Sequence, residues 1–379
     1  MNKPSKKITY VFLQGRKKRL DSEKSISKEF FYSYFFAKDN FENVKIVEME
    51  NYERKPIQFF LRKCDTLFNK LTKLPIYTYA IFKKKNLEAF NDSDYILLST
   101  DRVAFSCLPL IWLAKRRNKN LNISFFVMGL FANFPKYKIQ KVLRHLFINL
   151  MFKKVNKIFF LGKTEYQFAT KNYYNFNDKF VFLPFSIDTD FWKSQTSIQF
   201  SEKKNILFIG NDGNRDYEFV VKLAKELSQF NFIFITEKIK KESVPKNVKL
   251  IRGSWGMEQL TDEEIRNYYE YSRITIIPIK NTNQPSGQSV ALQSMSMNTP
   301  VIISNIDGFW DKESFIDNEH LLFISENNIK IWSEKITDLY FNEKKYESIR
   351  KKGQKLILEK YNISSFDKKV FNSLGLINE

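Results

Sequence analysis

The residues from Ile274 to Ser304 constrain the fold more than any other stretch, because two apolar runs enclose a helical pattern. Ile274–Ile279 and Val301–Ser304 have the length and composition of buried strands. Between them, a Pro-Ser-Gly opening precedes apolar residues at helical spacing, namely Val290, Leu292, Met295 and Met297. The stretch therefore predicts a βαβ unit of a parallel sheet.

The helix of this unit opens with Ser286-Gly287-Gln288-Ser289, which suits an anionic ligand. Ligands of parallel sheets bind beyond the carboxyl ends of the strands, and the free N–H groups of a helix N-terminus attract phosphate. Gly287 would let a ligand approach the backbone, and Ser286 or Ser289 would cap the helix or bond a phosphate oxygen. Gln293 would point its amide towards the same mouth. A capped helix without a ligand explains these residues equally well.

This stretch resembles the donor-site segment of the GT-B glycosyltransferases, particularly the family 4 type, with matches at Leu292, Met295, Pro300, Val301 and Ile302. In that segment a first Glu contacts the sugar and a second Glu holds the nucleotide ribose. Here Pro285 stands at the first position, Gln293 at the second, and Asn298 where a turn glycine is usual. A glutamine amide can still bond a ribose diol, whereas a proline cannot replace a carboxylate.

The run Asn205–Gly210 predicts the first strand of a second Rossmann-like domain. The resemblance implies an arginine directly after this glycine and a lysine about five residues later, both against the donor diphosphate. Asn211 takes the first place and Arg215 falls close to the second. Because a guanidinium is a forked donor that matches phosphate, the phosphate role is transferred to Arg215. An exposed arginine in a turn is the alternative.

Gly253 belongs to the loop 252–255, where the resemblance implies backbone contacts to the nucleobase. In the first half, Gly15 and Arg16 directly follow the apolar strand Lys7–Gln14. The resemblance places that loop near the donor diphosphate, with Arg16 offsetting its charge; a turn with solvated basic residues is equally compatible.

Asp101 follows the predicted strand Asp94–Thr100 and is the candidate catalytic residue. A carboxylate at the carboxyl end of a parallel strand could meet an acceptor hydroxyl. A helix N-cap at Asp101 explains the residue slightly better.

Two predicted amphipathic helices carry cations beside an apolar face. The first, Lys55–Lys73, has apolar positions at helical spacing, namely Ile57, Phe60, Leu61, Cys64, Leu67, Phe68 and Leu71. The second, Lys138–Phe152, repeats the pattern. The cations are Arg62, Lys63, Lys70 and Lys73 in the first helix, and Lys138, Lys141 and Arg144 in the second. Each apolar face either packs on the core or lies in a membrane interface with its cations towards anionic headgroups.

The net charge of +20 is concentrated in the first half of the chain. Residues 1–190 contain 35 Lys and Arg against 17 Asp and Glu, a net of +18, and residues 191–379 contain 27 against 25, a net of +2. A lysine-rich genome would act on both halves alike. The asymmetry therefore indicates an acidic partner of the first half.

Few residues are available for metal or disulfide chemistry. The chain has two cysteines and two histidines, so we expect no disulfide framework, no metal site and no cofactor. We also expect no signal peptide and no membrane-spanning helix, because no apolar run reaches about 20 residues. These features predict a cytoplasmic protein that binds peripherally to the inner face of the cell membrane.

We predict an α/β protein of the GT-B class, with two facing Rossmann-like domains, a central cleft and a C-terminal crossover helix. Residues 1–185 would form the acceptor and membrane domain, 186–202 a linker, 203–360 the nucleotide-sugar donor domain, and 361–379 the helix that crosses back.

The predicted function is transfer of a sugar from a nucleoside-diphosphate sugar to a lipid or lipid-linked acceptor. The resemblance implies retention at the anomeric carbon. Fixed donors would stabilise the leaving diphosphate in place of a metal. A catalytically inactive GT-B-like nucleotide-binding protein is the first alternative. A basic nucleic-acid-binding protein is the weaker one, since no nucleic-acid module is recognisable.

Overall fold

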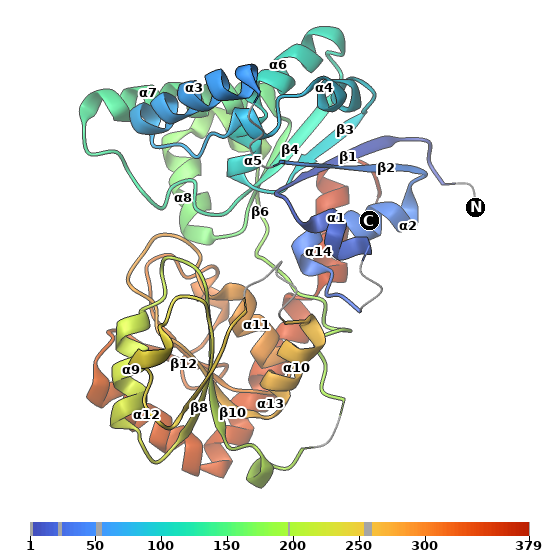
Figure 1. Ribbon diagram of the computed structural model, residues 1–379. Coiled ribbons are helices and arrows are strands. Elements are labelled where there is room, and N and C mark those ends of the chain that lie inside the picture. The colour runs from blue at the N-terminus through green and yellow to red at the C-terminus, as the bar shows by residue number, and fades with distance from the viewer. Residues whose placement is uncertain (1–2, 22–24, 51–54, 196–197, 254–259, 379) are drawn as a thin grey trace. The chain divides into compact units, whose positions relative to one another are not determined.

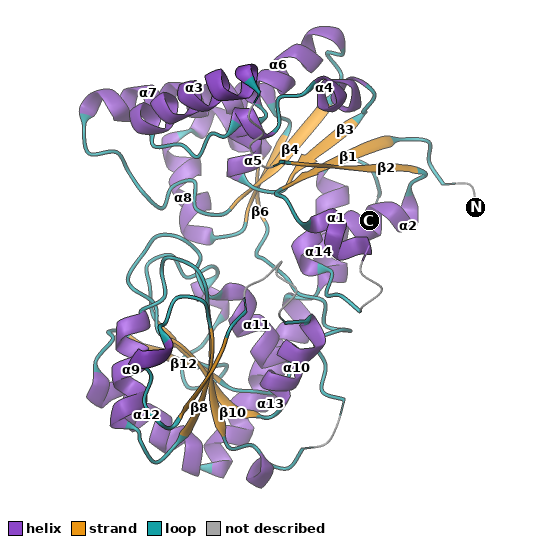
Figure 2. Cartoon of the chain, viewed as in Figure 1, coloured by secondary structure: helices purple, strands orange, loops and turns teal. Residues whose placement is uncertain are grey.

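The computed structural model describes residues 3–21, 25–50, 55–195, 198–253 and 260–378 (Figure 1). The chain divides into two compact units, which are described separately. The first comprises residues 1–22, 30–183 and 367–379, and the second comprises residues 23–29 and 184–366. Each contains one sheet flanked by helices, as the colouring by secondary structure shows (Figure 2).

The first unit is built on a six-stranded parallel sheet of order β2-β1-β3-β4-β5-β6. Except for the edge strand β2, its strands are mostly apolar and buried on both faces, as expected for a sheet covered on both sides. They are β1 (Lys7–Phe12), β2 (Asn43–Glu48), β3 (Tyr95–Leu98), β4 (Asn122–Val127), β5 (Lys157–Phe160) and β6 (Phe180–Phe182).

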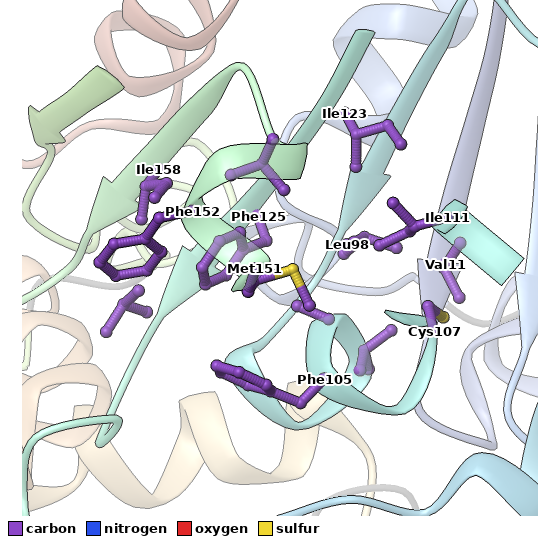
Figure 3. Close-up of a cluster of buried hydrophobic side chains, with 14 of the residues drawn as sticks. Val11, Leu98, Phe105, Cys107, Ile111, Ile123, Phe125, Met151, Phe152 and Ile158 are labelled. Atoms are coloured by element: carbon purple, nitrogen blue, oxygen red, sulfur yellow. The ribbon is translucent and has the colours of Figure 1, made fainter. Parts of the chain in front are cut away.

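The main core of the first unit lies between this sheet and the helices that connect its strands. Val11, Leu98 and Phe125 of the sheet pack with Phe105 and Met151 of the helices (Figure 3). The helices are α1 (Arg16–Asp21), α2 (Tyr34–Asn40), α3 (Pro56–Thr72), α4 (Lys84–Asn91), α5 (Asp101–Ser106), α6 (Leu108–Arg117), α7 (Lys138–Lys154) and α8 (Lys163–Asn172).

The C-terminal helix α14 (Ile363–Ser373) reaches the first unit from Asp367 onwards. There the Phe371 ring lies 4.9 Å from that of Phe36 and 5.5 Å from that of Phe41, measured between centroids. The predicted C-terminal crossover is therefore present.

The second unit contains another parallel sheet, of order β12-β11-β10-β7-β8-β9. Its strands are β7 (Asn205–Ile209), β8 (Asn231–Ile235), β9 (Val248–Ile251), β10 (Ser272–Ile277), β11 (Val301–Ser304) and β12 (Leu322–Ile324). Its helices are α9 (Tyr217–Glu226), α10 (Asp262–Glu270), α11 (Gln288–Ser296), α12 (Ile329–Phe341) and α13 (Glu343–Lys360).

The predicted βαβ unit is formed by β10, α11 and β11. Strand β10 ends at Ile277, two residues before the predicted end, and Pro278 follows it. Proline has no N–H group for the ladder, which accounts for the early end.

The unit boundaries differ from the predicted domains in two places. Residues 23–29 belong to the second unit, where Ser27 donates from its N–H and hydroxyl to Asp262 Oδ2 at 2.8 and 2.9 Å. The predicted linker 186–202 is not an open connection in its described part. Ile187 and Trp192 are buried, and the Ile187 N–H donates to the Tyr361 carbonyl at 2.9 Å.

Among the described residues, no helix is long and apolar enough to cross a membrane.

Candidate functional site

The strand order of the second sheet reverses between β7 and β10, and the loops after these two strands are joined to each other. Asn214 Nδ2 donates to Ser286 Oγ at 2.6 Å and to Gln284 Oε1 at 3.0 Å. The Lys280 N–H donates to the Asn214 carbonyl at 2.9 Å. Ligands of such sheets bind at the reversal point. The two loops that carry Arg215 and Ser286 are thus joined at the point where the prediction puts the ligand.

Arg215 is buried in the first of these loops, so the alternative of an exposed turn arginine is wrong. It is 3% exposed, and its Nη1 lies 2.8 Å from Asp212 Oδ2. The side chain crosses the face of Gly210, where a Cβ atom would come within 2.7 Å of Arg215 Cγ. Arg215 Nε has no hydrogen-bond partner within the part of the chain that the structure describes. One donor of this guanidinium is therefore buried without a partner among the described residues.

Gly287 is the N-cap of α11 and has a φ of 83°, a conformation that favours glycine. A Cβ atom there would also lie 3.0 Å from Ile277 Cγ2 and Ile279 Cδ1. Backbone conformation and packing on β10 thus already require a glycine at this position.

Neither predicted serine cap forms at α11. The helix has no side-chain cap, and Ser286 Oγ accepts from Asn214 instead. Gln288 is buried and Ser289 half-buried. Because no side chain caps the helix, its first N–H groups remain suited to an anion.

Asn211 connects the loops after β7, β8 and β9. Its Oδ1 accepts from the Glu237 N–H at 2.7 Å and the Thr236 hydroxyl at 3.2 Å, and its Nδ2 donates to the Gly253 carbonyl at 2.8 Å. This network explains an asparagine without invoking phosphate.

Gly253 packs closely on Leu260, and a Cβ atom at position 253 would lie 2.4 Å from Leu260 Cδ1, so that side chain would have to shift. Ser254 and Trp255 of the same predicted nucleobase loop lie outside the described residues.

Gln293 is buried in α11, and both sides of its amide are engaged. Its Oε1 accepts from the Tyr269 hydroxyl at 3.1 Å, and its Nε2 donates to Glu29 Oε1 at 2.9 Å. Glu29 also accepts from Trp192 Nε1 at 2.7 Å, and burial raises its pKa to about 7. Sequence reasoning missed Glu29, since no local pattern connects it to a helix 264 residues away.

In the first sheet the order reverses between β1 and β3, which are followed by Gly15 and Asp101. Gly15 has a φ of 102°, and a Cβ atom added to it would meet no atom of the described residues within 4 Å, so its surroundings are open. Arg16 Nε donates to the Phe30 carbonyl at 3.1 Å, and burial lowers the pKa of Arg16 to about 10. Arg16 is thus partly committed to the protein.

Asp101 is not the helix cap that the sequence favoured. Thr100 caps α5 by accepting from the Val103 N–H, and Asp101 is the first residue of the helix. Asp101 is buried, accepts from the Met128 N–H at 3.3 Å, and has a pKa raised by that burial.

A second buried acid, Glu165 of α8, lies in the same unit and was not predicted. Its two oxygens accept from the N–H groups of Gly129 and Phe131 at 2.8 and 2.7 Å. Burial raises its pKa to about 8. Glu165 therefore shapes the loop after β4.

Helix α3 is oriented opposite to the usual pattern of a surface helix. It buries the polar residues Gln58, Asp65 and Thr72. It exposes large apolar residues, namely Ile57, Phe59, Phe60, Leu67 and Phe68. Packing of the apolar face on the core, one of the two predicted alternatives, is therefore wrong for α3.

Helix α7 lies beside α3 and also exposes apolar side chains (Figure 1). The exposed residues are Ile139, Val142, Leu146 and Leu150, with Phe134 and Tyr137 just before the helix. Gln140 Nε2 of α7 donates to the Lys70 carbonyl of α3 at 3.0 Å. We call these exposed apolar residues of both helices the α3/α7 face.

Six of the seven cations predicted for this surface are exposed, namely Arg62, Lys63, Lys70, Lys73, Lys138 and Lys141. Arg144 is not one of them. Its guanidinium is buried and donates to the carbonyls of Thr72 at 3.2 Å, Lys73 at 2.7 Å and Leu130. The prediction that Arg144 faces a membrane is wrong, because these carbonyls hold it inside the unit.

No group of His, Cys, Asp or Glu side chains that could hold a metal ion occurs among the residues for which the structure gives positions.

Residues 190–356, which include Arg215, α11 and Gln293, match the family described as glycosyl transferases group 1. A search of curated proteins finds no match to the sequence.

Solved structures resemble the chain over nearly its whole length. Sucrose-phosphate synthase from Thermosynechococcus elongatus has a TM-score of 0.67 at 13% identity, covering 97% of this chain and 98% of that one. Anabaena HepE in complex with UDP-glucose has a TM-score of 0.62 at 9% identity, covering 97% and 100%. A glycosyltransferase from Rickettsia africae has 0.62 at 14% identity, covering 97% of each chain.

The fold and the matched domain define the class of protein: it is a glycosyltransferase of the GT-B fold. More closely, its second unit carries a group 1 glycosyl transferase domain at residues 190–356.

Proposed function

We propose that the protein transfers a sugar from a nucleoside-diphosphate sugar to a lipid or lipid-linked acceptor at the cytoplasmic face of the cell membrane. The observation that carries the acceptor class is the inverted orientation of α3, which buries polar residues and exposes aromatic ones. An apolar surface bordered by cations matches an anionic membrane.

The donor end of the reaction is assigned to the second unit. The diphosphate lies against the uncapped N-terminus of α11, with Arg215 as a charged partner. These groups are fixed before the donor arrives, so they stabilise the charge that develops on the leaving diphosphate without a metal ion. Uracil is the first base to test, because Anabaena HepE is solved with UDP and UDP-glucose.

The donor is tested by a thermal-shift panel of UDP, GDP, ADP and their sugars. A ligand that binds only the folded state raises the melting temperature by mass action. A shift with one diphosphate family and not with the others identifies the base. No shift with any of them contradicts the donor assignment.

The acceptor is tested by incubating the protein, the identified labelled donor and a crude membrane extract. We expect label in the organic phase and release of the nucleoside diphosphate. Label only in water-soluble glycans contradicts a lipid acceptor. Neither product, despite donor binding, favours the inactive nucleotide-binding alternative, which the missing carboxylate at Pro285 motivates.

Retention at the anomeric carbon is part of the proposal, since the resemblance to the family 4 type implies it. NMR of the purified product tests retention, because the anomeric coupling constants of product and donor show whether the configuration is the same. An inverted product contradicts retention without affecting the donor or the acceptor.

A further inference from the structure

A carboxylate from the beginning of the chain lies under the donor helix of the second unit. Glu29 is 2% exposed, and its Oε1 accepts from Trp192 Nε1 at 2.7 Å and from Gln293 Nε2 at 2.9 Å. Its Oε2 lies 3.4 Å from the Asp188 N–H. Ser27, two residues earlier, is anchored to Asp262 of α10. The segment 25–29 thus belongs to the donor unit through its contacts, although the chain before residue 23 and after residue 29 belongs to the first unit.

These contacts form a chain of hydrogen bonds with one direction. The Tyr269 hydroxyl donates to Gln293 Oε1, and Gln293 Nε2 donates to Glu29. An ionised carboxylate can only accept, so it fixes the Gln293 amide with its oxygen towards Tyr269. A protonated Glu29 carries an O–H that needs an acceptor, while three N–H groups already point at its oxygens. Protonation therefore disrupts this arrangement.

The charged groups around Glu29 come from several elements. Burial is the main cause of the raised pKa of Glu29. The hydrogen bonds from Gln293 of α11 and Trp192 lower this pKa, and Asp262 of α10 raises it. Tyr269 of α10 interacts electrostatically with both Glu29 and Arg215. Asp188, whose N–H points at Glu29 Oε2, interacts electrostatically with Lys28 and Asp190. The cluster therefore reaches from Glu29 to the proposed phosphate partner Arg215.

We propose that Glu29 is a positioning residue of the donor site: in its ionised form it orients the Gln293 amide for the nucleotide, and its protonation weakens donor binding. The inference rests on the proposed function, since it takes α11 as the donor helix. The carboxylate that would act beside α11 thus comes from Glu29, 264 residues before Gln293.

The test is calorimetric titration of the purified full-length protein with UDP, or with the diphosphate identified by thermal shift, between pH 5.5 and 8.5. In the wild type, affinity falls about tenfold as the pH drops through 7, the size expected for loss of one well-formed hydrogen bond to a charged group. At pH 7, binding releases a fraction of a proton, detected as a dependence of the heat on buffer ionisation. In Glu29→Gln the affinity is low at every pH and no proton is released.

Two further variants separate positioning from a merely structural effect. Glu29→Gln combined with Gln293→Glu restores one carboxylate and one amide in the pair, and it recovers most of the affinity at pH 8. Glu270→Gln is the matched control. Glu270 is also buried in the donor unit, but it accepts from Ser194 Oγ and the Gln195 N–H instead of α11. Its affinity keeps the wild-type pH profile.

The outcomes distinguish this inference from the proposed function. If the wild type binds the diphosphate and Glu29→Gln binds it equally well at every pH, the positioning role is wrong and the donor assignment stands. If the Glu270→Gln profile changes like that of Glu29→Gln, the effect is structural and the positioning role is also wrong. If the wild type binds no nucleoside diphosphate, both are wrong.

Discussion

The two units differ in the kind of side chain that they place unfavourably: the second buries polar residues and the first exposes apolar ones. The second unit buries the polar residues Arg215, Gln293 and Glu29. The first unit exposes apolar residues, five of them on α3 and four on α7. The sequence charge is also divided, at +18 for residues 1–190 and +2 for residues 191–379.

This contrast indicates which kind of partner each unit suits. Buried polar groups destabilise a fold unless they are paired, so a rigid polar cluster is most readily explained by a polar ligand. A contiguous exposed apolar face is rare on soluble surfaces and marks an interaction site. This is why we propose a nucleotide as the ligand of the second unit and a membrane as the partner of the first.

The largest effect is expected for membrane binding by the first unit. Changing Arg62, Lys63, Lys70 and Lys73 to Gln should abolish flotation with anionic vesicles, because each cation near such a surface contributes on the order of 1 kcal/mol. Salt should release the wild-type protein from vesicles in the same assay, since the attraction fades within a Debye length.

The control tests the apolar contribution. Phe60→Ser on α3 should weaken flotation, whereas Phe341→Ser should not, although Phe60 and Phe341 are 65% and 67% exposed. Phe341 belongs to α12 of the second unit. Equal recovery of the wild type on neutral vesicles would contradict the electrostatic part, and no flotation with activity on soluble sugars would remove the lipid acceptor.

Much of the second unit could be predicted because its determinants are local. The apolar runs and the helical spacing between Ile274 and Ser304 identified β10, α11 and β11. The reversal point of a parallel sheet then brought the loops of Arg215 and Ser286 together without knowledge of any long-range contact. Glu29 could not be found in this way, because its partners on α11 and at Trp192 are joined to it only by the tertiary fold.

The first unit shows a different limit of the sequence. Periodicity reveals that α3 has an apolar face, but it does not reveal whether that face turns inwards. The orientation of α3 is fixed on its buried side by Asp65, which accepts a hydrogen bond from the Tyr79 N–H at 3.0 Å. Likewise, Arg144 has the spacing of a surface cation, but its guanidinium is buried because it donates to the carbonyls of Thr72, Lys73 and Leu130.

The second prediction sharpens the contrast by removing one buried charge. The pKa of Glu29 is raised from 4.5 to about 7, so the folded state holds its proton more tightly than the unfolded state. The stability that this provides is complete below pH 4.5 and is lost as the pH rises through 7, by about 3 kcal/mol at most. Glu29→Gln should therefore gain stability relative to the wild type between pH 5 and pH 8.

Thermal unfolding across this pH range measures the effect. Glu334→Gln, at an exposed position on α12, is the control and should follow the wild type throughout. A stability difference for Glu29→Gln that does not change with pH would show that the carboxyl group does not titrate in this window.

The third prediction concerns the buried guanidinium. Arg215→Ala should weaken binding of the nucleoside diphosphate by about 1.5–3 kcal/mol and leave nucleoside binding nearly unchanged, as for other charge-assisted bonds. Calorimetry with both ligands measures the difference. Arg350→Ala is the control, because Arg350 pairs with Glu347 in the same i,i+3 arrangement as Arg215 with Asp212. Equal losses for nucleoside and diphosphate would place Arg215 away from the phosphates.

The smallest effect is expected at Gln293, where the polar cluster meets the nucleotide. Gln293→Ala should raise the donor KM about fivefold to tenfold with less change in kcat, because a ribose contact is similar in the ground and transition states. Steady-state kinetics with the identified donor gives both constants. A loss of turnover at saturating donor would instead assign Gln293 to the chemical step, and the polar cluster of the second unit would then act on the reaction as well as on binding.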